Sequence, residues 1–167
     1  MAVADDVVLG IDFGTFSSKV VCSLPLRGTR SFVLFDHDGR NFPRVLYPTV
    51  CAVDRGRLIV GTDALTYPPE NTLHHLKVCF ACKHGVIGER QRRFPLPCES
   101  VCQVDALAVN IDSVVFCYLR ELLCQSLGYL FRNELLRHGD RLFANIALPV
   151  DFYEHEFCGV YKSILGD

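Results

Sequence analysis

The chain has 167 residues, of which 50% are apolar and 22% are charged, the composition of one folded domain with a substantial core. Its formal net charge of -2 leaves no overall basic field, so we expect neither a nucleic acid nor an anionic membrane as a partner. The opening MAVADDVVLG has no basic segment followed by a long apolar one, and no later window approaches the roughly 18 apolar residues of a spanning helix. Together these features predict a cytoplasmic protein.

Nine cysteines are scattered along the chain, mostly among apolar neighbours. This distribution is typical of reduced thiols that pack in a core, and it indicates a reducing compartment.

The first part of the chain is rich in predicted strands. Residues 7–13, 19–24 and 31–35 are β-rich runs separated by turn residues, which predicts an antiparallel meander. Residues 49–53 and 57–60 predict two further strands, joined at Asp54-Arg55-Gly56.

The second part is predicted to be mainly helical. Residues 71–80 predict a short helix, and residues 107–137 a longer one with apolar side chains at three- and four-residue spacing. Residues 143–148 predict a buried strand ended by Pro149, and residues 153–165 a last helix. This order indicates an α/β fold in one domain, with a small subdomain inserted at about residues 43–105.

The segment between the first two predicted strands, GIDFGTFSSKV, carries more than a hairpin turn requires. Asp12 would end a buried strand, and Gly14 would let the backbone come close to a ligand. Thr15 and the serines after it would offer hydroxyls and amides beside that ligand. The pattern predicts an anion or metal-phosphate site; the alternative is a tight hairpin that merely uses Gly14 and an exposed Asp12.

Four segments together resemble the DnaK-type seventy-kilodalton heat-shock chaperones, within the actin-like ATPase superfamily. They are GIDFGT at 10–15, LIVG at 58–61 followed by Asp63-Ala64, Asn71-Thr72 five residues before Lys77, and IALP at 146–149 followed by Asp151-Phe152. Sugar kinases share the first motif, but they would be expected to carry a tryptophan-bearing segment after it, and this chain has no tryptophan.

The resemblance implies a ribonuclease-H-like lobe with a mixed sheet and a small inserted subdomain, spanning residues 1–167. It covers the first half of the family's ATPase domain, without the second phosphate loop, the adenosine-binding segment or the opposite lobe. We therefore expect a partial ATP-binding lobe of a molecular chaperone that does not complete ATP hydrolysis alone.

The resemblance also assigns roles to individual residues. Asp12 is expected to hold Mg²⁺ through its water shell, and Lys77 to bring a positive charge to the γ-phosphate of ATP. Gly14, Thr15 and Phe16 are expected to face the phosphates of ATP or ADP. Phe16 departs from the family, which more often has a hydroxyl residue there, and residues 133–141 are extra.

Other interpretations of the same residues stay open. Lys77 alone would ordinarily be a solvated side chain on an amphipathic helix. The lobe is alternatively a non-catalytic interaction module or truncated isoform that binds a co-chaperone or a companion lobe. A third alternative is a zinc-stabilised module. Its candidate ligands are Cys79, Cys82, Cys98 and Cys102, with His84 as a substitute for one of them. The favoured interpretation of these cysteines is that they are unpaired thiols.

Overall fold

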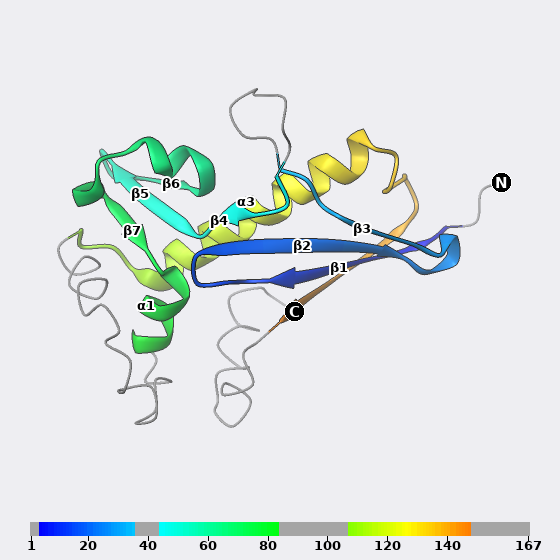
Figure 1. Ribbon diagram of the computed structural model, residues 1–167, viewed down its shortest axis with the longest axis horizontal. Coiled ribbons are helices and arrows are strands. Elements are labelled where there is room, and N and C mark those ends of the chain that lie inside the picture. Colours follow the sequence, from blue (N-terminus) through cyan, green and yellow to red (C-terminus); the bar gives the residue numbers. More distant parts are fainter. Residues whose placement is uncertain (1–3, 36–43, 84–106, 148–167) are drawn as a thin grey trace.

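The computed structural model describes residues 4–35, 44–83 and 107–147, and it is a mixed α/β fold with two sheets (Figure 1). The main sheet has the strand order β3-β2-β1-β8, and the two-residue strand β4 pairs with the beginning of β2. Its strands are β1 (Asp6–Asp12), β2 (Ser17–Leu24), β3 (Thr29–Phe32), β4 (Tyr47–Pro48) and β8 (Arg141–Ala147).

The main sheet is mixed, because β1 runs antiparallel to β2 and parallel to β8. Strands β1, β2 and β3 form consecutive antiparallel pairs, so the predicted opening meander is confirmed. A short 3-10 turn, η1 (Pro25–Arg27), connects β2 to β3.

The second sheet is smaller, antiparallel and ordered β6-β5-β7. Its strands are β5 (Val50–Asp54), β6 (Arg57–Val60) and β7 (Thr72–His74), and the 3-10 segments η2 (Gly61–Thr66) and η3 (Pro69–Asn71) lie between β6 and β7. The predicted hairpin is confirmed: Arg55 and Gly56, with φ of 48° and 76°, form a two-residue turn whose left-handed backbone matches the twist of the strands. The inserted subdomain at 43–105 stays a prediction.

The predicted helix at residues 71–80 is wrong in its first half. Residues 72–74 form β7, because Thr72 and Leu73 are buried and pair with β5, and this pairing overrides the local sequence signal. His75 then takes a left-handed backbone, with φ of 57°, and helix α1 (Leu76–Lys83) follows it directly.

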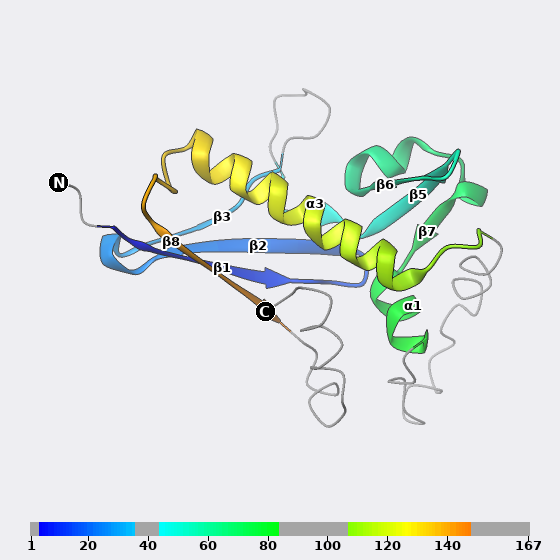
Figure 2. The same ribbon diagram turned by 180° about the vertical axis from the view of Figure 1, so that it is seen from behind.

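Helix α3 (Ile111–Arg132) crosses one face of the main sheet (Figure 2), and it lies within the predicted range 107–137. The Asn110 side chain caps its first turn by accepting hydrogen bonds from the amides of Asp112 and Ser113, at 2.9 and 3.3 Å. By length and composition α3 is apolar enough to cross a membrane, so the expectation that no window approaches a spanning helix is wrong by this criterion. Its apolar stripe packs into the core.

One core joins the two described sheets with helices α1 and α3. Along β1 the buried residues alternate, so that Val7, Leu9 and Ile11 face the core while Asp12 is exposed. The same cluster contains Leu73 of β7 and Phe80 of α1. The small sheet is therefore packed onto the large one through shared apolar contacts.

Strand β8 is present where residues 143–148 predicted a strand, but the prediction that it is buried is wrong. Leu142 and Phe143 are 41% and 47% exposed. Within the described ranges, β8 pairs only with β1 and ends the sheet on that side. The predicted helix at residues 153–165 lies outside the described residues.

Residues 133–140 form the connection from α3 to β8, and with Arg141 they are the residues that the resemblance implies to be extra. Asp140 anchors it by accepting hydrogen bonds from the amides of Asp5 and Arg137, both at 2.9 Å, and by pairing with Arg27 at 3.3 Å. These backbone hydrogen bonds, with the Arg27 charge, hold the pKa of the Asp140 carboxyl below its ordinary value.

Candidate functional site

The first turn, residues 13–16 between β1 and β2, is fixed from both sides. Phe13 is fully buried, and its ring lies 5.6 Å from that of Tyr118 on α3. The carbonyl of Phe16 accepts a hydrogen bond of 3.0 Å from the amide of Thr49. A Cβ added to Gly14 would collide with the carbonyl oxygen of Ser17, so the turn requires glycine because the backbone folds closely back on itself.

Three hydroxyls, those of Ser18, Thr49 and Tyr118, form a buried cluster behind the first turn. The Tyr118 hydroxyl donates to the Ser18 oxygen at 2.9 Å, and the Thr49 oxygen lies 3.2 Å from each of the other two. The cluster ties β2, the segment after β4 and α3 together. It thereby holds the strand that leaves the first turn in place.

The first turn meets the beginning of α1 through Phe16 and His75. Their rings make an edge-to-face contact with centroids 4.8 Å apart, although Phe16 is 76% exposed. The carbonyl of His75 accepts from the amides of Val78 and Cys79, at 2.8 and 3.1 Å, and so begins the hydrogen bonding of α1. This contact brings Lys77, in the first turn of α1, toward the end of β1.

Asp12 and Lys77 lie close enough to interact electrostatically. Partial burial lowers the pKa of the Lys77 ammonium, and the Asp12 carboxylate opposes this shift. Lys77 nevertheless forms no ion pair within 4.0 Å with any residue in the described part of the chain. Two of the predicted site residues are thus brought together, with a separation greater than direct contact.

Lys19 is a neighbour of Asp12 that the sequence analysis missed. It stands opposite Asp12 in the β1–β2 register, and its Nζ lies 3.3 Å from the Asp12 carboxylate. Both side chains are about half exposed, at 45% and 53%, so this pair contributes little to stability. The antiparallel hairpin itself was the signal: a residue that follows a turn directly opposes one that precedes it.

The remaining predicted phosphate contacts lie at the same turn. Thr15 is partly buried, and the exposed ring of Phe16 stands where a hydroxyl was expected from the resemblance. The turn therefore offers one hydroxyl at Thr15, a carboxylate and an incompletely neutralised lysine, arranged around a glycine that the tight backbone requires. Such a set can hold an anion together with a hydrated cation.

The zinc alternative gains no support from the described residues. No cluster of three or more His, Cys, Asp or Glu side chains with metal-binding geometry occurs among them. Cys79 is buried, and its thiol lies 3.7 Å from the carbonyl of His74. His84, Cys98 and Cys102 lie outside the described residues.

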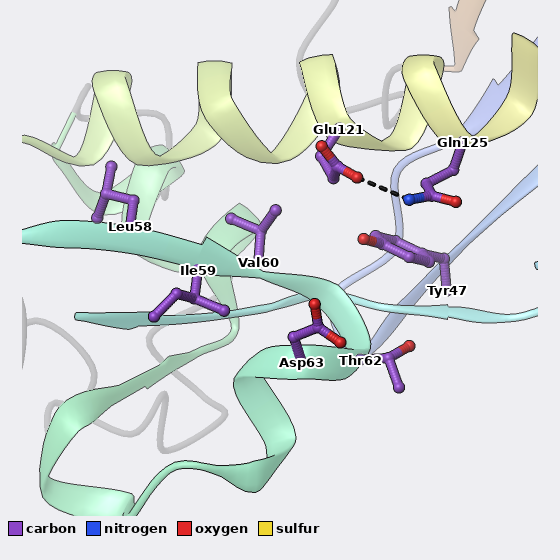
Figure 3. A pocket seen from close by; sticks show the side chains of 8 residues that line it. All are labelled: Tyr47, Leu58, Ile59, Val60, Thr62, Asp63, Glu121 and Gln125. Carbon is purple, nitrogen blue, oxygen red and sulfur yellow. Dashed lines mark hydrogen bonds between the residues drawn. The ribbon is translucent and has the colours of Figure 1, made fainter. Parts of the chain in front are cut away.

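A pocket of about 290 Å³ lies between α3 and the small sheet (Figure 3). Its lining includes none of the predicted site residues. The eight lining residues are Tyr47, Leu58, Ile59, Val60, Thr62, Asp63, Glu121 and Gln125.

In comparisons with known proteins, no family model matches this sequence, and no curated protein matches it either. The resemblance to the chaperone ATPases is carried by the four sequence segments alone and stays a prediction.

Proposed function

We propose that this chain is a phosphate-binding lobe of ribonuclease-H-like fold, related to the first lobe of the DnaK-type chaperone ATPases. The observation that carries the proposal is the approach of Lys77 to Asp12, two residues that belong to different elements and that the motifs assign to one site. The parallel pairing of β8 with β1 also supports it, since the resemblance implies a mixed sheet.

The proposed ligand is the polyphosphate of ATP or ADP with Mg²⁺. The exposed Asp12 carboxylate suits a hydrated magnesium ion, which keeps most of its water ligands in proteins. Lys77 suits an anion, because its partly desolvated charge is not neutralised by direct contact with a carboxylate. Gly14 suits a backbone that must bend tightly beside the phosphates.

Binding is expected to be weak and turnover slight, because one lobe supplies few of the contacts that enclose a nucleotide. Isothermal titration calorimetry with Mg·ADP and Mg·ATP tests this, and we expect a Kd between about 10 µM and 1 mM. Asp12→Asn should abolish the effect of Mg²⁺ on the affinity. Absence of binding at several millimolar nucleotide, or an effect of Mg²⁺ on the affinity of Asp12→Asn that is as large as on wild type, would contradict the proposal.

A second candidate function is that of an interaction module that binds a companion lobe or a co-chaperone. The exposure of Leu142 and Phe143 on β8 favours it, because an apolar strand at the end of the sheet, as far as the described residues form it, is suited to receive another chain. Gel filtration and pull-down of wild type beside Phe143→Ser test this. A monomeric wild type that captures no partner would count against it, as would capture that Phe143→Ser leaves unchanged.

A further inference from the structure

The pocket between α3 and the small sheet combines an apolar wall with acidic groups. Leu58 and Val60 of β6 point toward α3, and the ring of Tyr47 forms part of the wall (Figure 3). Tyr47 itself is only 6% exposed, and Gly61 allows its ring to lie there, because a Cβ at Gly61 would overlap with the ring. The wall is therefore part of the packed structure rather than a chance gap between loops.

Two carboxylates reach this pocket from different elements. Glu121 comes from α3 and Asp63 from η2, on opposite sides of the pocket (Figure 3). Gln125 donates a hydrogen bond of 2.8 Å to Glu121, which holds that carboxylate in place. Both carboxylates act on the Tyr47 hydroxyl. Burial is the main reason that its pKa is raised, and the charges of Glu121, Tyr118 and Asp63 raise it further.

Among the described residues, no lysine or arginine lines the pocket, and neither carboxylate forms an ion pair. An apolar wall between two uncompensated negative charges is complementary to a cationic group on an apolar stem. Divalent metal ions are a poorer match, because the described residues place no third carboxylate, histidine or thiol beside these two. A volume of about 290 Å³ suits a small ligand or a single side chain.

We propose that this pocket binds an alkylammonium group, with the ammonium between Glu121 and Asp63 and the alkyl stem against Leu58, Val60 and the Tyr47 ring. A free amine and the side chain of a lysine share this chemistry. The site is separate from the first turn, so this proposal stands or falls independently of nucleotide binding.

Titration of the ¹⁵N-labelled chain, followed by amide chemical shifts, tests the proposal. The probes are pentylammonium, 1-pentanol as an uncharged molecule with the same stem, and an acetylated and amidated Gly-Lys-Gly peptide. We expect saturable shifts at β6, η2 and the middle of α3 with at least one of the two ammonium probes, and binding of pentanol at least about fivefold weaker. Tighter binding of pentylammonium would identify a free amine as the ligand class, and tighter binding of the peptide a lysine side chain.

Isosteric variants give the matched comparison. Glu121→Gln keeps an oxygen that accepts from Gln125, and Asp63→Asn changes an exposed residue, so neither should disturb the fold. Glu121→Gln and Asp63→Asn should each weaken ammonium binding about fivefold without changing pentanol binding. Glu70 is an exposed acid outside the pocket, so Glu70→Gln should change neither the ammonium nor the pentanol affinity. The proposal is overturned if neither ammonium probe gives saturable shifts, or if pentanol binds as tightly as the ammonium probes do. The comparison of probes on wild type decides this even if a variant fails to fold.

Discussion

The Lys77 ammonium, in the first turn of α1, interacts electrostatically with the Asp12 carboxylate at the end of β1, and the two groups are not in direct contact. The contact of Phe16 with His75 places the first turn beside the beginning of α1, where Lys77 lies. Asp12 meanwhile pairs with Lys19, its cross-strand neighbour. A polyphosphate would complement the positive charge of Lys77, and a hydrated cation the negative charge of Asp12. These two residues therefore give the nucleotide proposal its most direct tests.

Lys77 should respond to nucleotide through its own titration. In the free chain, burial holds its pKa below the ordinary value of 10.5. A bound polyphosphate stabilises the charged form, so Mg·ADP should raise this pKa, which NMR of ¹³C-labelled lysine side chains can measure. Lys77→Met should weaken Mg·ADP binding about tenfold, and Lys77→Arg, which keeps the charge, by less. A Lys77 pKa that is insensitive to nucleotide would place the ligand elsewhere.

Gly14 and Gly10 form a matched pair for testing the first turn. Gly14→Ala should destabilise the protein by about 1–3 kcal/mol, because the added Cβ meets the carbonyl oxygen of Ser17 and the backbone must shift. Gly10→Ala places its Cβ no nearer than 3.9 Å to the Val21 carbonyl oxygen, so its effect should be neutral or slightly stabilising. Urea unfolding of the two variants measures the difference. Equal stabilities would show that the turn is not tightly constrained at Gly14.

Substitutions of Phe16 should change the affinity for Mg·ADP without a large change in the free energy of unfolding. Because its side chain is 76% exposed, Phe16→Thr and Phe16→Ala should each change the free energy of unfolding by less than about 1 kcal/mol. If the first turn faces phosphates, the threonine hydroxyl should strengthen Mg·ADP binding about tenfold or more relative to the alanine variant, since a hydrogen bond to a charged group contributes about 1.5–3 kcal/mol. Calorimetry on the three proteins measures this. Equal affinities of the threonine and alanine variants would show that residue 16 does not face the ligand.

Much of the β structure could be predicted because it is local. The opening meander and the Arg55-Gly56 hairpin depend on alternation and turn residues that lie next to each other in the sequence. Residues 72–74 were assigned to a helix because their strand is defined by pairing with β5, which no local pattern reveals. The exposure of β8 was missed for a similar reason: its apolar composition indicates burial, but its place at the end of the described sheet depends on topology.

The candidate site shows the same division. The sequence pattern of the first turn predicted that Gly14 lets the backbone come close to a ligand, with a tight hairpin as the alternative. The collision of an added Cβ with Ser17 shows the tight turn, and the approach to a ligand stays a prediction. The approach of Lys77 to Asp12 was expected only from the resemblance, since helical spacing alone favours a solvated lysine. The hydroxyl cluster of Ser18, Thr49 and Tyr118 was not predicted at all, because each member comes from a different element and none has a distinctive local pattern.

The hydroxyl cluster makes the stability of the protein sensitive to alkaline pH. Burial raises the pKa of Tyr118 to about 12, from 10.0, while its hydrogen bonds to Ser18 and Thr49 oppose the shift. Between these two values the unfolded chain has lost the Tyr118 proton and the folded chain still binds it. The free energy of unfolding should therefore fall as pH rises, by up to about 1.4 kcal/mol per pH unit from this group, and the contribution is fully present below pH 10.

Tyr118→Phe removes the titrating hydroxyl and leaves the Ser18 and Thr49 oxygens 3.2 Å apart, able to hydrogen-bond to each other. At pH 7 it should therefore lower the free energy of unfolding by only about 1 kcal/mol. Between pH 10 and 12 its free energy of unfolding should fall less steeply than that of wild type. Some slope should remain, because burial also raises the pKa of the Cys51 thiol to about 12. Urea unfolding across this range, with reductant present and Tyr129→Phe as a control outside the cluster, measures the slopes. If Tyr118→Phe and wild type lose stability in parallel, the Tyr118 hydroxyl is not held protonated by the fold, and the cluster does not have the geometry described.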